Sequence, residues 1–192
     1  TLAAARQNEE IVKKKEEREV LELVLRLKMP THVVDRLFTE GSDVLQTSYV
    51  IKSCHVAFCQ FQVTEPTDAA AAPTPNTMER LQLLTALIDS TLPCDGSGKL
   101  RYVEKIKTIG DVVMLGGSLV PAVAAVVSDP EVLLELLQFT VDLQTELEAV
   151  PELLDVKCLI GVDRGEVTTA TIGNVNLEYD VFGTTVNTAA RV

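Results

Sequence analysis

Three polar residues near the end of the chain have a spacing that could serve phosphate chemistry. The stretch LEYDVFGTTVNTAARV, residues 177–192, contains Asp180, Asn187 and Arg191 within a pattern of strand, turn and helix start. An interval of four residues places Asn187 and Arg191 on one face of a helix, and the free N–H groups at a helix start favour anions. An isolated asparagine here would more often be a helix cap. An anion site is therefore a hypothesis that the rest of the chain must support.

Composition and charge narrow the classes of partner. The chain has 192 residues, is 46% hydrophobic and carries a formal net charge of -11. These values indicate a globular domain large enough to bury a core. The negative charge and the lack of a basic stripe disfavour nucleic acid as a partner. A single anionic nucleotide could still bind, because a few local cations and backbone N–H groups can outweigh a distant negative field.

A zinc centre is not predicted. No two cysteines have the CxxC spacing, and the two histidines lie far from any metal-ligand pattern. Scattered thiols of this kind are usually small buried hydrophobes in a reducing compartment. No apolar run approaches the roughly 18 residues that cross a bilayer. Because the chain starts at Thr1 and stops just after a helix-start signal, we expect a cytoplasmic piece of a larger protein whose absent parts could reach a membrane.

The elements that must position these residues begin with an amphipathic helix over residues 1–28. Its apolar positions recur at three and four residues, and Pro30 ends it. The helix either packs on its own domain or forms a coiled-coil stalk that carries a signal or a dimer contact. Two heptads are too few to decide between these interpretations.

The remaining pattern alternates strands and helices. Residues 48–63 are rich in β-branched and aromatic types and predict a central strand, and residues 78–91 predict a helix. Residues 100–117 predict a hairpin that turns at Gly110 and Asp111, and the last long segment before the tail predicts two strands around Arg164 and Gly165. The sum is an α+β domain of ferredoxin-like βαββαβ order with extra strands, preceded by the amphipathic helix.

A long helix is predicted between the hairpin and the last strands. Asp129 and Pro130 are typical of an N-cap and a first helical position. The leucines predicted to face inward are Leu133, Leu136, Leu137 and Leu147.

Two motifs carry a resemblance to a known family. VEKIKTIGD, residues 103–111, and YDVFGTTVNTAARV, residues 179–192, resemble the catalytic domain of class III nucleotide cyclases. The first motif is most similar to the second catalytic half of heterodimeric animal adenylyl cyclases. The resemblance covers about residues 20–192 and implies a cyclase catalytic domain over residues 29–192 that is incomplete at its carboxy-terminal end.

The resemblance implies a shared active site. In related cyclases the ribose 3′-hydroxyl attacks the α-phosphorus and expels pyrophosphate, and two aspartates of one subunit hold two magnesium or manganese ions. The other subunit of a head-to-tail dimer reads the base. By this resemblance, Lys107 and Asp180 bind adenine, Asn187 positions the ribose and Arg191 stabilises the transition state. A lone lysine in a strand would otherwise be read as a solvated side chain.

The metal-binding half departs from the family pattern. Gln60, in FCQFQVTEP, occupies the position of the first metal aspartate, whereas the second is retained as Asp111. A neutral amide is a poor ligand for two hard cations. Glu166 stands where the metal-bearing half carries a phosphate-binding arginine, and it would repel a triphosphate. The departures from the family pattern at Gln60 and Glu166 therefore both fall on the metal-binding side of the shared site.

The resemblance leaves three functions to compare. The first is an adenylyl cyclase domain that binds ATP and complements a different cyclase domain, which holds most of the metal coordination. The alternative is an inactive pseudocyclase with a regulatory or dimerisation role, favoured by the altered FCQFQVTEP stretch. A guanylyl cyclase is disfavoured, because that activity usually goes with Glu and a small residue in place of Lys107 and Asp180.

Overall fold

The computed structural model describes residues 2–41, 48–63, 77–92, 102–120, 124–173 and 177–191. Two helices come first, and a mixed region of strands and helices follows. In chain order the elements are α1 (Leu2–Arg26), α2 (Thr31–Glu40), β1 (Ser48–Val63), α3 (Thr77–Thr91), β2 (Val103–Ile109), β3 (Val112–Gly117), α5 (Asp129–Ala149), the 3-10 helix η2 (Pro151–Leu153), β4 (Val156–Ile172), β5 (Glu178–Phe182) and α6 (Thr184–Ala189).

The five strands form one antiparallel sheet. Their order is β2-β3-β1-β4-β5, so β1 lies in the middle as its apolar composition predicts. The first four strands have the ferredoxin-like order, and β5 is an extra strand paired with β4. The predicted α+β fold class is confirmed.

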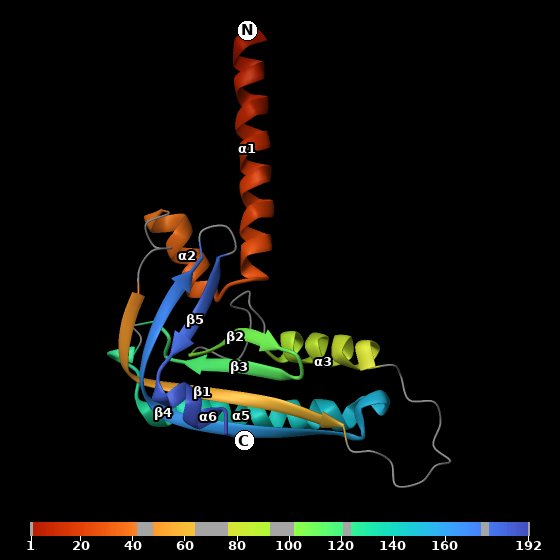
Figure 1. The fold of residues 1–192 in the computed structure, drawn as a ribbon. Helices are drawn as coiled ribbons and strands as arrows, with labels where there is room; N and C mark the ends of the chain where they lie inside the picture. The colour runs from red at the N-terminus through yellow and green to blue at the C-terminus, as the bar shows by residue number, and fades with distance from the viewer. Residues whose placement is uncertain are drawn as a thin grey trace.

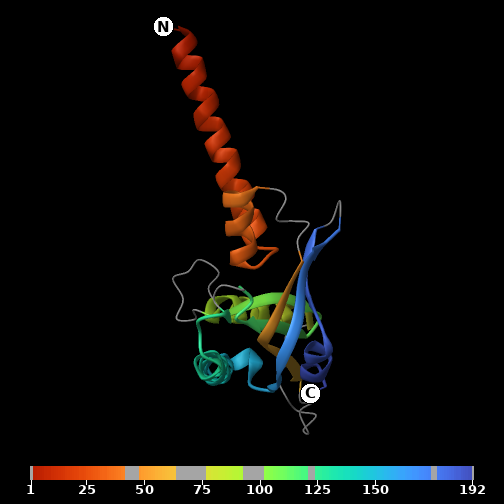
Figure 2. The ribbon, with the colours of Figure 1, turned by 90° about the vertical axis from the view of Figure 1, so that its left-hand side faces the viewer.

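Helices cover both faces of this sheet. α3 and α5 pack on one face around Leu115, Phe139 and Leu143, which are almost fully buried. Figures 1 and 2 show these two helices on the same side of the sheet. On the other face, α2 and α6 contribute Val34 and Ala189 to a second cluster. Lys107 and Gln60 are paired with Met114 and Val112, which lie on this second face.

The structure corrects the prediction of two strands around Arg164 and Gly165. The segment is one continuous strand, β4. β1 pairs with β4 from Ser48 to Val63, and the register of this pairing shifts locally after Ile51. A glycine within a paired strand marks a close approach rather than a turn, since a side chain at Gly165 would collide with Thr185 of α6.

The inward face of α5 also differs from the prediction. Leu136 and Leu147 are buried as expected, whereas Leu133 and Leu137 are exposed. The remaining buried positions are Val132, Phe139 and Leu143. The five buried positions recur at intervals of three and four residues and form one stripe, whereas Leu133 and Leu137 each follow a buried position by one residue and so point away from it.

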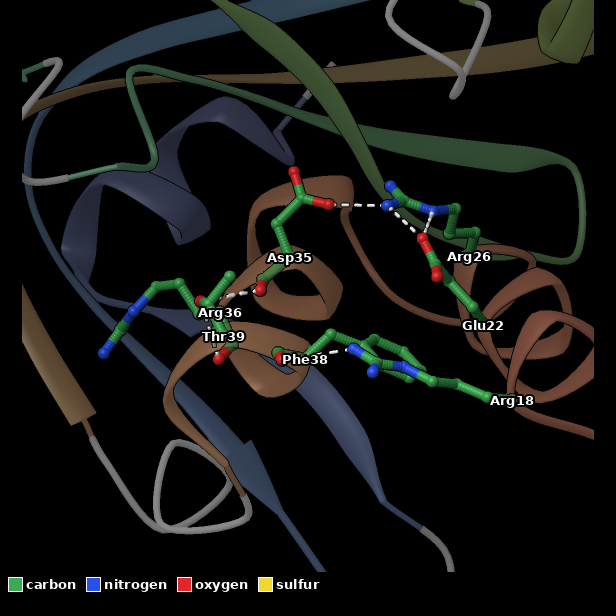
Figure 3. A network of polar contacts seen from close by, with 7 residues as sticks. All are labelled: Arg18, Glu22, Arg26, Asp35, Arg36, Phe38 and Thr39. Atoms are coloured by element: carbon green, nitrogen blue, oxygen red, sulfur yellow. Dashed lines mark hydrogen bonds and ion pairs between the residues drawn. The ribbon is translucent and has the colours of Figure 1, made fainter. Parts of the chain in front are cut away.

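α1 extends away from the sheet (Figures 1 and 2). Its apolar side chains are largely exposed, and Leu27 just beyond it is 78% exposed. Arg26 joins α1 to α2 by binding Asp35 at 2.5 Å, and it also binds Glu22 within α1 at 2.7 Å (Figure 3). Arg18 adds a second contact to α2, stacking over the Phe38 ring at 5.1 Å. Within the described residues, no helix is both long and apolar enough to cross a membrane.

Candidate active site

The structure brings Lys107 and Asp180 together. Lys107 lies on β2 and Asp180 on β5, which are the two outermost strands of the sheet. The Lys107 ammonium donates to Oδ2 of Asp180 at 2.6 Å, although 73 residues separate the two positions. The twist of the sheet brings its two outer strands into contact at this point. A cation and a carboxylate thus lie side by side in a half-buried position.

A β-bulge in β2 aims Lys107 toward this contact. Glu104 is paired with Gly116 of β3, and Lys107 with Met114, while the register shifts between Lys105 and Lys107. In a regular strand, residues three apart point to opposite faces. The bulge places Glu104 and Lys107 on the same face, because bulges insert one residue and redirect the next side chain.

The carboxylate of Asp180 is held in a defined orientation. Its Oδ1 accepts a hydrogen bond from the Val181 backbone N–H at 2.8 Å, while Oδ2 accepts from Lys107. Lys107 is 35% exposed and Asp180 is 23% exposed, so both remain reachable from solvent. A base edge with one ring-nitrogen acceptor and one amino donor matches this pair, because Lys107 can donate and Asp180 can accept.

Gln60 and Asp111 lie at neighbouring positions of β1 and the β2–β3 turn. Gln60 is paired with Val112, the residue after Asp111, and the Phe61 N–H donates to the Asp111 carbonyl at 2.9 Å. Asp111 is exposed. No cluster of three His, Cys, Asp or Glu suited to a metal ion occurs among the residues that the structure describes. One carboxylate beside an amide does not fit a site for two divalent ions, so Gln60 and Asp111 alone do not provide the ligands to hold them.

Asn187 and Arg191 lie in and after the short helix α6. Asn187 belongs to the helix, but Arg191 follows its C-terminal end at Ala190. Both backbone N–H groups are used, since Asn187 donates to Gly183 at 3.4 Å and Arg191 to Thr188 at 3.1 Å. The expectation that Asn187 and Arg191 share one face of a helix is therefore wrong, because the helix has only six residues and ends before Arg191.

Both side chains on and after α6 are exposed. In the described part of the chain, no hydrogen bond or ion pair joins Asn187 or Arg191 to Lys107, Asp180, Gln60 or Asp111. The structure thus pairs two of the predicted site residues, places two others at adjacent positions, and leaves Asn187 and Arg191 open to solvent.

Glu166 is less repulsive toward an anion than its charge alone predicts. It lies on β4 and binds the Lys52 ammonium at 2.5 Å. Both side chains are well exposed, so water weakens the pair. Lys52 offsets part of the negative charge, and the sequence pattern did not indicate this partner.

Three residues beside the Lys107–Asp180 pair were not predicted from the sequence. His32 of α2 contacts the Glu104 carboxylate through Nδ1 and packs against the Tyr179 ring, with ring centroids 5.4 Å apart. Burial raises the pKa of Tyr179 above its usual value, so the phenol stays neutral. Glu104 and Tyr179 lie within the two motifs, but nothing in local spacing indicates that His32 joins them.

A pocket of about 950 Å³ lies next to these residues. It is bordered by the end of α1, α3, β2 and the start of β5, and Glu104, Lys107 and Tyr179 are among its lining residues. Asp180 is not one of them. The pocket therefore shares one side with the Lys107–Asp180 pair but lies mainly toward the N-terminal helices.

Comparisons with known proteins identify the domain type. Residues 50–192 match the family model described as Adenylate and Guanylate cyclase catalytic domain. Adenylate cyclase type 9 of Xenopus laevis is 33% identical over 94 residues, which are 47% of this chain and 7% of that protein. The chain therefore corresponds to a small part of that relative.

Solved structures agree with this domain type. The catalytic core of a rhodopsin-guanylyl cyclase with converted specificity, solved with ATPαS, is 26% identical with a TM-score of 0.54, covering 75% of this chain and 72% of that chain. A bacterial light-regulated adenylyl cyclase has a TM-score of 0.64 and 18% identity, covering 94% of this chain and 49% of that chain. At that identity, the second match supports the fold alone.

Proposed function

Because this chain belongs to the adenylate and guanylate cyclase catalytic domain family, we propose that it converts ATP to cyclic AMP and pyrophosphate as one half of a shared site. It supplies adenine recognition and charge neutralisation. A different cyclase domain, arranged head to tail, supplies most of the coordination of magnesium or manganese. The domain would be cytoplasmic, and any contact with a membrane would come through other parts of a parent protein.

The Lys107–Asp180 pair is the observation that carries this proposal. Adenine presents a ring-nitrogen acceptor beside an amino donor, and guanine presents the reverse order at the corresponding edge. Lys107 donates to the ring nitrogen of adenine, and Asp180 accepts from its amino group. With guanine, Asp180 would face a carbonyl oxygen, and two acceptors in contact leave a polar group unpaired.

The remaining residues act on the sugar and phosphates. The ribose 3′-oxygen forms a bond to the α-phosphorus as the bond from that phosphorus to pyrophosphate breaks, and the hydroxyl proton is released. Asn187 orients the ribose, and Arg191 neutralises the charge that develops on the phosphoryl oxygens. The divalent ions, when held by the partner, would activate the 3′-hydroxyl.

A base-exchange experiment tests the assignment. Lys107→Glu combined with Asp180→Cys, in the chain reconstituted with a metal-bearing cyclase domain, should shift the ratio of kcat/KM from ATP toward GTP by at least about tenfold, or about 1.4 kcal/mol. Cyclic AMP and cyclic GMP are measured separately. Lys105→Glu is the matched control, because Lys105 lies on the same strand but binds Asp89 of α3. Unchanged base preference in the double variant would contradict the proposal.

A second candidate is a pseudocyclase that regulates or dimerises without turnover. Gln60 at the metal-ligand position favours it, since one carboxylate at Asp111 does not fit two metal ions. The two candidates differ in one measurement. A pseudocyclase yields no cyclic nucleotide with any metal-bearing partner, whereas a complementing domain does.

A further inference from the structure

We propose that His32 is a positioning residue that holds β2 and β5 at the separation at which Lys107 and Asp180 can bind a base. This inference rests on the proposed function and names a determinant of base selectivity at the same site. His32 lies in the first turn of α2, outside both sequence motifs. It has no direct contact with the proposed base-binding atoms and acts through its two neighbours.

No hydrogen-bond ladder sets the distance between β2 and β5. The two strands lie at opposite ends of the sheet order, and each pairs on one side only, β2 with β3 and β5 with β4. The twist of the sheet brings the two strands near each other, and side-chain contacts then set their separation. One such contact is the Lys107–Asp180 ion pair itself, which must open when a base takes the place of each partner.

His32 supplies a bridge that stays in place when the ion pair opens. Its Nδ1 contacts the Glu104 carboxylate of β2, and its ring meets the Tyr179 ring of β5 nearly at right angles, at 82°. Edge-to-face ring contacts of this kind add roughly 0.5–1.5 kcal/mol beyond the area they bury. His32 thus touches both outer strands at once.

The bridge lies next to the base-binding pair on each strand. Tyr179 directly precedes Asp180. Glu104 shares a face of β2 with Lys107 because of the bulge between them. The His32 side chain is 13% exposed and Tyr179 is 7% exposed, so the bridge is packed rather than a loose surface contact. A shift of either strand would move a base-binding side chain with it.

The bridge also connects the site to α1. His32 belongs to α2, and Arg26 at the end of α1 binds Asp35 one turn further along α2 (Figure 3). A displacement of α1 would therefore reach Glu104 and Tyr179 through α2. The bridge gives the N-terminal helix a physical route to the base-binding pair.

The first test follows the strands directly and does not need catalysis. Hydrogen–deuterium exchange of β5 in the purified chain should be at least about fivefold faster in His32→Ala than in wild type, because β5 loses its packing partner. His32→Asn retains a donor near the Nδ1 position and should keep the Glu104 contact, but it has no ring to pack on Tyr179, so β5 should exchange about as fast as in His32→Ala. Lys105→Ala is the matched control, since it breaks a half-buried ion pair on the other face of β2, and β5 exchange should not change.

The second test measures base selectivity in the chain reconstituted with a metal-bearing cyclase domain. His32→Ala should lower the ratio of kcat/KM for ATP over GTP by about five- to tenfold, mainly through KM for ATP, and His32→Asn, which keeps only the contact with β2, should not restore it. Lys105→Ala should leave the ratio within about twofold. Thermal unfolding verifies that each variant is folded. If His32→Ala does not fold, Glu104→Gln replaces it, because it keeps the size of the side chain and removes the charge.

The outcomes separate this inference from the proposed function. Unchanged β5 exchange and unchanged selectivity in folded His32→Ala would overturn the positioning role, as would an equal effect of Lys105→Ala. A wild-type pair that makes no cyclic AMP would overturn the proposed function instead. The exchange measurement would then still decide whether His32 joins the two strands.

Discussion

The Lys107–Asp180 ion pair must separate before either side chain can bind a base. Both residues are partly exposed, and ion pairs in such positions contribute about 1 kcal/mol or less. The Val181 N–H continues to hold Asp180 when Lys107 turns away. Replacing the ion pair by contacts with a base therefore costs little free energy. In the absence of nucleotide, the ion pair keeps the two side chains oriented.

Arg191 provides a prediction about the chemical step. Arg191→Ala in the reconstituted pair should lower kcat at least about tenfold and leave KM for ATP within about threefold, because it removes a charge that acts mainly in the transition state. Steady-state kinetics of cyclic AMP formation measure both constants. Lys157→Ala, at an exposed position on β4, is the control and should behave as wild type. A large rise in KM with unchanged kcat would assign Arg191 to substrate binding instead.

Gln60 provides a prediction about metal dependence. Gln60→Asp would place a second carboxylate at the register position next to Asp111. We expect it to raise magnesium-dependent cyclic AMP formation by the chain alone at least about tenfold, since hard cations prefer charged oxygen ligands. Gln62→Asp adds the same charge two residues along β1 and should have no such effect. Equal activities of the two variants would remove Gln60 from the metal site.

At the scale of the element, Asp129 at the start of α5 does not cap the helix but joins it to the sheet. Asp129 was predicted as the N-cap, but Ser128 takes that position. The Asp129 carboxylate instead accepts a hydrogen bond from Ser53 at 2.8 Å and binds Arg164, which joins α5 to β1 and β4. These contacts hold the pKa of Asp129 below its usual range, the Ser53 hydrogen bond most strongly.

The Ser128 cap yields a stability prediction. Its hydroxyl and backbone N–H donate to the Glu131 carboxylate at 2.6 and 3.0 Å and lower the pKa of Glu131. Ser128→Ala should lower the free energy of unfolding by about 1 kcal/mol and Tm by roughly 2–4 °C at neutral pH.

The effect of this cap should depend on pH. A carboxylate with a lowered folded-state pKa stabilises the protein above its unfolded-state pKa and loses that contribution as pH falls through the folded-state value. The difference between Ser128→Ala and wild type should therefore narrow in acid, as followed by circular dichroism. Ser90→Ala, near the end of α3, is the control. A difference that does not vary with pH would exclude Glu131 from the cap.

At the scale of the whole molecule, the proposed function divides the site residues unevenly between the two halves of a shared site. The Lys107–Asp180 pair that we propose binds the base is present, whereas the positions proposed to bind metal hold one carboxylate. We expect the chain alone to be nearly inactive with magnesium and ATP. Mixing it with a metal-bearing cyclase domain should raise cyclic AMP formation at least about 100-fold above the sum of the separate activities, in line with assembly of one complete site. Lys107→Glu in the mixture is the control, and no gain with wild type would contradict complementation.

The exposed apolar side chains of α1 would fit a second helix, and that partner helix is a prediction. Leu23 on α1 and Leu27 just after it are largely exposed, and α1 extends away from the sheet (Figure 1). Their three- and four-residue spacing with Val20 is compatible with the coiled-coil interpretation of residues 1–28. Burying such side chains against a second helix would remove apolar surface from water.

Much of the architecture follows from local pattern. Periodicity and turn residues predicted β1, α3, the β2–β3 hairpin and α5, because the physical preferences that form these elements act over a few neighbouring residues. The same local reasoning divided β4 into two strands, since a glycine within a paired strand and a glycine in a turn look alike until the partner strand is known. The candidate site residues came from motif resemblance, and their chemical roles remain proposals.

Tertiary structure decided how the candidate residues meet. The bulge that turns Lys107 toward Asp180 depends on the pairing of β2 with β3, and the contact of β2 with β5 depends on the twist of all five strands. His32 lies 72 residues before Glu104, and no periodicity links them. Contacts between residues so far apart depend on the packing of the complete fold, whereas short-range patterns contain only the preferences of each segment.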